Sequence, residues 1–426
     1  MASSASTTAG LTPETWTSRA VFTIIVLGLS AGVQLSDQGV QSLSLSAMQR
    51  AFGVSDAALG AVQGLAGFFV GSLFAIPLSR LVDKFSRKLI LLCLITASTT
   101  MMVLSAFAPT FELFFLGRSS AGILEFAMIP LVYSMIPDLS PEKDRVLANL
   151  GFAAIMAAGA SGGYYFGAAI IGAGDAIFPF SIEPWRKGFL LISLSGLPLL
   201  LLALLTLDPP RYPGFFNSSG PVSIGTFLRQ RRRVIVLFLG VAGCLLVAVQ
   251  ALNQLIALAL ERRFEADIAS IGQAMGVILL IVSAGSIPAA GLLDRLFARR
   301  FARASRPAVM AFGVSLAVPA SFMLVATSNV EHAYILVGVF MFSTATANAL
   351  IPTMLQDLVP PPLRARSFAV WSFLVSIFSA SGPLLAGALS DAFLQNDLLP
   401  AIILVAIPAL SLSALSAARL ILELSD

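Results

Sequence analysis

Long apolar runs recur along the whole chain, and each has the length that an α-helix needs to cross a lipid bilayer. They lie at about 20–42, 57–79, 88–107, 111–135, 146–172, 187–207, 232–258, 269–292, 307–327, 332–355, 366–389 and 398–420. About 20 apolar residues span the hydrocarbon core, and a helix or a closed barrel is needed to satisfy the backbone hydrogen bonds there. The runs therefore predict an all-α membrane protein with twelve transmembrane helices.

The composition agrees with this prediction. Hydrophobic residues make up 57% of the 426 residues and charged residues only 11%, whereas a soluble domain averages about 25% charged residues. We therefore expect the lipid bilayer to be a partner of this chain. The net charge of +4 gives little support to nucleic-acid binding, which we exclude. The first apolar run is too long for the core of a cleavable signal peptide, so we expect it to remain as the first span.

The positive charges of the loops orient the predicted helices. Twelve spans place both termini on one side, and most of the 26 Lys and Arg residues fall in loops on that side. The few that fall in loops on the other side are Arg50, Arg186, Lys187, Arg262 and Arg263. Because positive residues accumulate in cytoplasmic loops, the termini are predicted to be cytoplasmic, in a multi-pass protein of the inner (plasma) membrane.

A short motif repeats in the two halves of the chain. Asp138 and Arg145 belong to the pattern D-L-x-P-x-x-x-R between spans 4 and 5, and Asp357 and Arg364 belong to the same pattern between spans 10 and 11. A proline-rich connection at 208–231 separates the halves. We therefore predict two six-helix bundles, 1–207 and 232–426, joined by a linker. Repeated halves with a substrate site between them are typical of secondary transporters.

Three ionisable residues lie well inside predicted spans, away from their ends, namely Asp37 in span 1 and Arg118 and Glu125 in span 4. Each costs about 2.5–3.5 kcal/mol at the centre of a membrane helix, so such groups usually face one another or a wet cavity. Arg118 and Glu125 are two turns apart on one face of a helix, so a direct pair forms only if both side chains lean together. Our hypothesis is that Asp37 and Glu125 share proton coupling, while Arg118 neutralises them or holds an anionic head group. A cluster that only locks spans 1 and 4 together is the alternative.

The sequence lacks the residues that several other classes of protein require. The one histidine, His332, cannot build a metal site alone, and the nucleotide-binding pattern G-x-x-x-x-G-K-[ST] is absent. We therefore predict no enzyme activity, no metal and no cofactor. The internal repeat favours a carrier over a channel.

Two segments resemble signatures of the major facilitator superfamily. The segment 79–88, SRLVDKFSRK, resembles its G-x-x-x-D-R-x-G-R-R signature, with Ser79 and Ser86 in place of the two glycines. The segment 117–125, GRSSAGILE, resembles its R-x-x-x-G pattern. Residues 37–125 are similar to the spinster family in particular, through F-G-V-x-D at 52–56 and through both segments. Gln38 stands where that family usually has arginine, and Leu124 and Phe126 replace a glycine and an alanine.

The resemblance implies a function and a set of site residues. It implies the major facilitator fold and proton-coupled transport of lysolipids or sphingoid lipids by alternating access, with Asp37, Gln38, Arg118 and Glu125 binding the substrate. A proton-linked carrier of small organic anions or drugs remains the alternative, in which Arg118 holds a carboxylate. Symport and antiport both stay open, and we expect a monomer.

A cytoplasmic latch is also implied by the resemblance. Its residues would bridge the two bundles when the protein opens to the outside, and they are Asp83, Lys84, Arg87, Lys88, Arg145, Asp294 and Arg295. The alternative for these charges is a topogenic role alone.

Overall fold

The structure is a computed structural model that describes residues 15–74, 85–209, 229–359 and 364–425. These residues form helices and connecting loops. The first half contains α1 (Ser18–Leu43), α2 (Leu45–Phe52), α3 (Asp56–Ala61), η1 (Val62–Val70), α5 (Arg87–Ala106), α6 (Phe111–Leu139), η2 (Glu142–Asp144), α7 (Arg145–Tyr165), α8 (Gly167–Ile177), α9 (Pro184–Leu194) and α10 (Gly196–Leu204). The second half contains α12 (Arg232–Phe264), α13 (Ile268–Phe301), η3 (Ala302–Ala304), α14 (Ser305–Ala326), α15 (Val330–Asn348), α16 (Ile351–Leu358), α17 (Arg364–Phe393) and α18 (Leu398–Ser425).

The prediction of twelve membrane-spanning helices is confirmed. Among the described residues, 12 helical segments are long and apolar enough to cross a membrane. Several begin at a residue whose side chain caps the first turn, as Thr17 does for Ala20 and Ser86 for Leu89, both at 3.1 Å. Such caps satisfy backbone N–H groups that have no partner within the helix. Local sequence therefore fixes where these spans begin.

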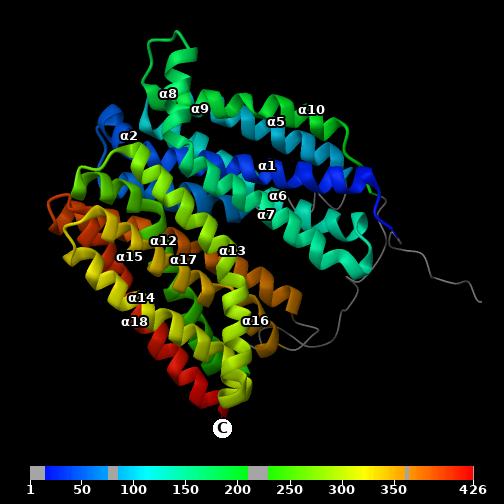
Figure 1. Ribbon diagram of the computed structural model, residues 1–426, viewed down its shortest axis with the longest axis vertical. Coiled ribbons are helices and arrows are strands. Elements are labelled where there is room, and N and C mark those ends of the chain that lie inside the picture. Colours follow the sequence, from blue (N-terminus) through cyan, green and yellow to red (C-terminus); the bar gives the residue numbers. More distant parts are fainter. Residues whose placement is uncertain (1–14, 75–84, 210–228, 360–363, 426) are drawn as a thin grey trace, which may run out of the picture.

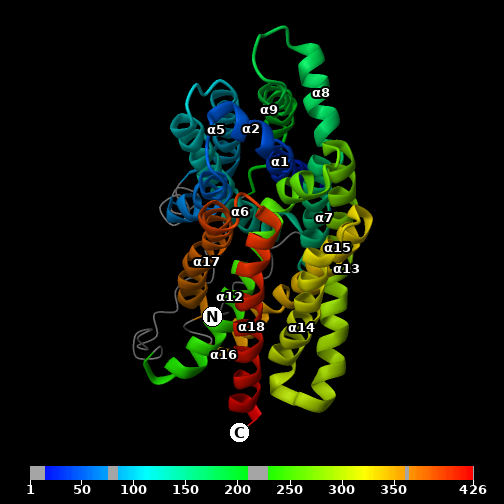
Figure 2. The same ribbon diagram turned by 90° about the vertical axis from the view of Figure 1, so that its left-hand side faces the viewer.

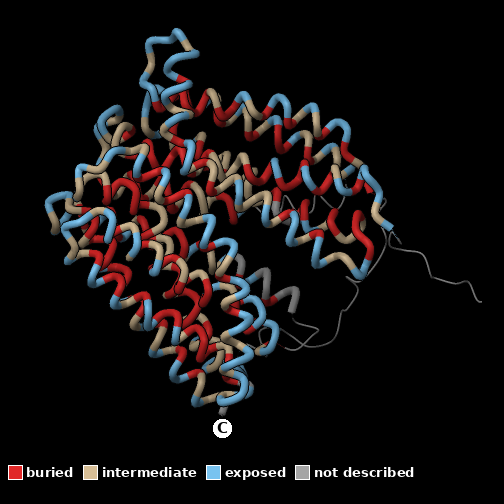
Figure 3. The backbone as a smooth tube through the Cα atoms, in the orientation of Figure 1, coloured by how far each residue is buried: buried red, intermediate tan, exposed pale blue. Residues whose placement is uncertain are grey.

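The helices form two bundles that converge at one end of the molecule. In Figure 1 the bundles meet near α2 and diverge toward the start of α1 and the end of α18. We call these the α2 end and the terminal end. Figure 2, seen from the α2 side, shows the helices of the first half above those of the second half. The buried stretches in Figure 3 follow the faces where helices meet. Many large apolar side chains remain exposed, among them Leu147, Leu205 and Leu292, as expected for helices that face lipid.

The fifth span differs from the prediction. The apolar run 146–172 was expected to form one helix, but α7 ends at Tyr165 and the chain continues as the separate helix α8. At the junction Phe166 has φ −96° and ψ 0°, outside regular helix geometry. The small apolar residues of α8 extended the predicted span, although α8 packs on α9 instead of continuing α7.

Two spans of the second half are longer than predicted. Helix α12 has 33 residues and α13 has 34, which correspond to about 50 Å at 1.5 Å per residue. The hydrocarbon core is only about 30 Å thick. Both helices therefore extend beyond the apolar runs into segments that end with arginines, Arg262 and Arg263 in α12 and Arg299 and Arg300 in α13.

The internal repeat includes an ion pair in each half. Asp138, at the end of α6, accepts a hydrogen bond of 2.5 Å from Arg87 at the start of α5. Asp357, at the end of α16, forms an ion pair with Arg306 at the start of α14. The separation along the chain from Arg87 to Arg306 equals that from Asp138 to Asp357. Arg306 is therefore the counterpart of Arg87 in the second half.

Small residues bring the two bundles into close contact toward the α2 end. Gly60 and Gly64 lie so close to the carbonyl groups of Pro383 and Ala380 in α17 that a Cβ atom on either glycine would collide with them. Likewise, a Cβ on Gly276 of α13 would meet α7 at Ser161. Small residues allow membrane helices to approach in this way. The contact brings α1, η1, α6 and α12 together around the site described next.

Candidate functional site

Asp37 and Arg118 form a buried ion pair between α1 and α6. The Arg118 Nη1 atom donates to Asp37 Oδ2, and the two residues are only 3% and 8% exposed. The guanidinium group also lies 5.7 Å from the centre of the Phe189 ring. The second oxygen of Asp37, Oδ1, is buried and has no hydrogen-bond partner within the part of the chain that the structure describes. The expectation that these ionisable groups face each other is met for this pair.

Glu125 interacts with Gln38 and forms no direct pair with Arg118. The Nε2 atom of Gln38 donates to both carboxylate oxygens of Glu125, at 2.9 and 2.8 Å. Arg118 directs its hydrogen bond to Asp37, so the side chains of Arg118 and Glu125 do not lean together in the way that a direct pair requires. Two adjacent residues of α1, Asp37 and Gln38, thus contact Arg118 and Glu125 of α6.

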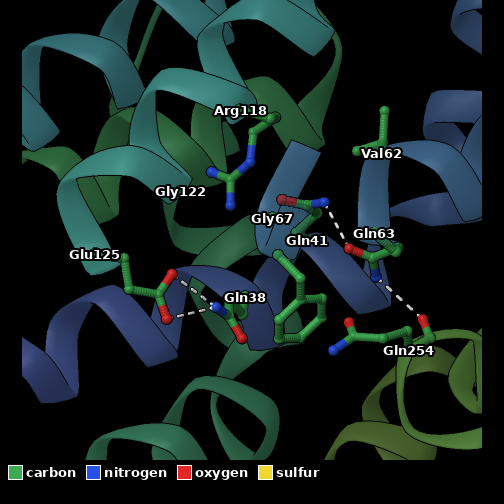
Figure 4. A pocket seen from close by; sticks show the side chains of 10 residues that line it. Gln38, Gln41, Val62, Gln63, Gly67, Arg118, Gly122, Glu125 and Gln254 are labelled. Atoms are coloured by element: carbon green, nitrogen blue, oxygen red, sulfur yellow. Dashed lines mark hydrogen bonds between the residues drawn. The ribbon is translucent and has the colours of Figure 1, made fainter. Parts of the chain in front are cut away.

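A small polar cavity lies beside these pairs, and Figure 4 shows it. Its volume is about 20 Å³, and it is lined by Gln38, Gln41, Val62, Gln63, Gly67, Phe68, Arg118, Gly122, Glu125 and Gln254. This volume has room for about one water molecule. The first bundle contributes the charged groups, while α12 of the second bundle contributes the neutral amide of Gln254.

Sequence reasoning did not find three of these glutamines, Gln41, Gln63 and Gln254. A signal was present on α1, where Gln34, Gln38 and Gln41 follow one another at the spacing of one helical face. Gln63 lies on η1, a stretch of π-helix. Such π-helical turns are rare and occur often at functional sites.

A second, apolar pocket of about 250 Å³ also has Glu125 in its lining. It is formed by α1, α6 and α7 and is lined by Ala31, Gln34, Leu35, Glu125, Met128, Val132, Tyr133, Phe152 and Met156. Glu125 is therefore the residue that both the polar cavity and the apolar pocket include. The two spaces together offer polar groups and an apolar surface next to one residue, Glu125.

A charged cluster that the sequence did not predict joins the bundles at the α2 end. Asp56, at the start of α3, is 1% exposed. Both its carboxylate oxygens accept hydrogen bonds from Arg262 of α12, at 2.7 and 2.9 Å. Ser390 of α17 donates to the same carboxylate at 2.7 Å, and Gln49 of α2 donates at 3.0 Å. In return, the carboxylate of Asp391 accepts the backbone N–H groups of Asp56 and Ala57.

The described residues of the predicted latch lie at the terminal end, and three of them, Arg87, Lys88 and Asp294, make contacts within their own bundle. Arg87 pairs with Asp138, and Lys88 donates to the carbonyl of Leu204 at 2.5 Å. Asp294 accepts a hydrogen bond of 2.6 Å from Ser305.

The side chains of the other latch residues form no such contact within the described part of the chain, or lie outside it. Arg295 is exposed, and the Nε atom of Arg145 is buried without a partner among the described residues. Asp83 and Lys84 lie outside the described residues.

Two bundles of membrane-length helices, joined at one end around buried ionisable groups, define a polytopic membrane transporter. The chain belongs to the Major Facilitator Superfamily, whose sequence profile matches residues 27–351. This membership indicates a transporter and not an enzyme.

Solved structures share the fold over nearly the whole chain. A bacterial homologue of the human lysosomal transporter Spinster, in an inward-facing and unoccupied conformation, has a TM-score of 0.80 at 20% identity, covering 96% of this chain and 99% of that chain. The inward-facing and occupied conformation has a TM-score of 0.77 at 20% identity, covering 96% of each chain. The nucleoside transporter NupG has a TM-score of 0.69 at 17% identity, covering 93% of this chain and 98% of that chain. At these identities the likeness shows the fold alone.

Proposed function

We propose that this protein is a proton-coupled secondary transporter that moves an amphiphilic, lipid-like substrate by alternating access. The observation that carries the proposal is the position of Glu125, which lines both the polar cavity and the apolar pocket. An amphiphile needs these two environments side by side, one for its head group and one for its chain. A small organic anion needs only the polar one.

Proton coupling is supported by the partners of the two carboxylates. Asp37 uses one oxygen for Arg118, so its unpartnered Oδ1 can take a proton without displacing the guanidinium. Glu125 faces an amide, and an amide can donate to a carboxylate or, after rotation, accept from a carboxylic acid. Both carboxyl groups therefore have surroundings that accommodate a proton.

Substrate binding is assigned to Asp37, Gln38, Arg118 and Glu125 together. Arg118 forms its ion pair through Nη1, and a guanidinium carries further N–H donors. These donors can hold the anionic part of a head group. The sulfur and aromatic side chains of Met128, Met156 and Phe152 form a surface on which an acyl chain can lie.

Alternating access is supported by the different contacts at the two ends of the molecule. The α2 end is joined across the bundles by Asp56 and Arg262. At the terminal end, Arg87, Lys88 and Asp294 form their contacts within their own bundle. The loop charges favour a cytoplasmic terminal end, in which case this conformation opens inward, like that of the bacterial Spinster homologue.

In the opposite conformation, we propose that the latch residues join the bundles at the terminal end while the cluster around Asp56 separates. One chain supplies all residues of the site, so a monomer in the inner membrane suffices for transport.

A transport assay in proteoliposomes tests the proposal. The purified protein is given a labelled lysophospholipid, a sphingoid base or a small organic acid, with and without an imposed proton gradient. We expect gradient-dependent movement of a lipid that a protonophore abolishes and that small acids do not inhibit. The Glu331→Gln variant is the protein control, because Glu331 is exposed in the first turn of α15. Movement of small acids without movement of either lipid would contradict the proposal and favour the organic-anion alternative.

A further inference from the structure

A chain of hydrogen-bonded amide groups that line the polar cavity connects one bundle to the other. Gln63 Nε2 donates to the backbone carbonyl of Gln254 at 3.0 Å and to Ser42 Oγ at 3.2 Å. A backbone carbonyl can only accept a hydrogen bond. This contact therefore fixes the orientation of the Gln63 amide, with its nitrogen toward Gln254 and its oxygen toward Gln41.

The orientation of Gln63 determines that of Gln41. Because Gln63 presents its oxygen, Gln41 must present its nitrogen, and Gln41 Nε2 donates to Gln63 Oε1 at 2.6 Å. The carbonyl oxygen of Gln41 then points away from Gln63, as Figure 4 shows. Gln41 is 2% exposed, and its Oε1 atom accepts no hydrogen bond from the described residues.

A buried acceptor without a donor is unfavourable by about 1–3 kcal/mol. Gln41 lines the polar cavity together with Arg118 and Glu125, so a group that enters the cavity can supply the missing donor. The volume of about 20 Å³ admits one small group, such as a primary ammonium or a hydroxyl, and excludes a bulky one. An ammonium there would also face the Glu125 carboxylate.

We propose that Gln41 Oε1 is a specificity-determining acceptor for a single N–H or O–H donor at the end of the substrate's polar head. The selected substrates are then lysolipids or sphingoid lipids with a primary amine or a free hydroxyl, in preference to trimethylammonium heads. This inference rests on the proposed function. Since Gln254 of the second bundle also lines the cavity, the acceptor is in place while the bundles are joined at the α2 end.

Competitive binding of two matched lysophospholipids tests this assignment. An ethanolamine lysophospholipid carries N–H donors, and the choline lysophospholipid with the same acyl chain carries none. Each displaces a fluorescent lysophospholipid from the full-length protein in nanodiscs. Because the ethanolamine lipid can form one hydrogen bond to Gln41 that the choline lipid cannot form, we expect the wild-type protein to bind the ethanolamine lipid about tenfold more tightly than the choline lipid.

Two substitutions of Gln41 separate hydrogen bonding from size. Gln41→Met has nearly the same length but no acceptor, so we expect the ethanolamine preference to fall close to onefold while the choline lipid binds as before. Gln41→Glu keeps an acceptor, and we expect it to keep or increase the preference. The matched control is Gln273→Met, an exposed glutamine on α13, which should leave the preference unchanged.

The binding results separate the role of Gln41 from the proposed lipid substrate. If lysolipids bind and Gln41→Met keeps the full preference, the cavity selects by size alone and the role of Gln41 is overturned. If Gln41→Met does not fold, a reduced preference in Gln41→Glu overturns the role and an undiminished one supports it. If no lysolipid displaces the probe in any variant, the proposed lipid substrate fails, and this assignment fails with it.

Discussion

The side-chain nitrogen of Gln38 lies 2.9 Å from one carboxylate oxygen of Glu125 and 2.8 Å from the other. A glutamine amide carries a donor and an acceptor on the same planar group, so a half-turn of the amide exchanges them. The Gln38 amide can therefore form a hydrogen bond with Glu125 both when Glu125 is a carboxylate and when it is a carboxylic acid. An arginine at this position could only donate, and would favour the carboxylate.

Replacing Gln38 by arginine should slow proton-coupled transport. The guanidinium would hold Glu125 in its charged form, and a hydrogen bond to a charged group is worth about 1.5–3 kcal/mol, so the proton-driven rate should fall about tenfold or more. The measurement is initial uptake into proteoliposomes under a proton gradient. The control is Gln273→Arg, at an exposed position of α13. Normal proton-driven uptake by Gln38→Arg would show that Glu125 does not need a partner that can both donate and accept a hydrogen bond.

Replacing Arg262 by glutamine should separate the bundles at the α2 end. The substitution leaves the buried carboxylate of Asp56 without its ion pair, and breaking a buried pair in this way destabilises the joined state by about 3–5 kcal/mol. Spin labels at Ala51 and Gln395, both exposed near this end, would report a shift to longer distances in a background where Cys93 and Cys244 are replaced.

The neighbouring arginine supplies the control for that experiment. Arg263 pairs at 3.3 Å with Asp397, and both side chains are more than 40% exposed, at 43% and 41%. An exposed pair contributes only about 0–1 kcal/mol, so Arg263→Gln should leave the distances unchanged. Equal shifts in the two variants would mean that the Asp56 cluster does not hold the α2 end together.

The two repeated aspartates should differ in their effect on stability. Asp138→Asn removes a pair whose side chains are 11% and 17% exposed, while Asp357 is 58% exposed. Since solvent weakens exposed pairs, Asp138→Asn should lower the apparent melting temperature more than Asp357→Asn does. Thermal unfolding in detergent, followed by tryptophan fluorescence, measures this difference. The opposite order would indicate that the pair in the second half has a role beyond local stability.

The fold could be predicted from the sequence because apolar length is a strong local signal. A run such as 398–420 can satisfy its backbone in lipid only as a helix, and α18 is observed as Leu398–Ser425. The end of α7 at Tyr165 was not predictable in the same way, because the residues of α8 remain small and apolar. There the packing of α8 on α9 decides the outcome.

The site could be predicted only in part. Asp37, Arg118 and Glu125 were found because a charge inside a span is costly and therefore conspicuous. Gln41 and Gln63 are neutral and cost less, so the sequence does not mark them. Asp56 and Arg262 lie at the ends of spans in different halves, where water could solvate either one. Their pairing depends on how the bundles cross, which no local pattern specifies.

The most direct test of proton coupling is the proton flux that accompanies lysolipid movement. Proteoliposomes containing a pH-sensitive dye receive a lysolipid gradient and no proton gradient. We predict that the wild-type protein changes the internal pH. Asp37→Asn and Glu125→Gln should reduce this change at least tenfold, since each removes a group to which we assign the gain and release of a proton. Lysolipid exchange without a net gradient should persist in Glu125→Gln. An undiminished proton flux in both variants would contradict the assignment of coupling to these two residues.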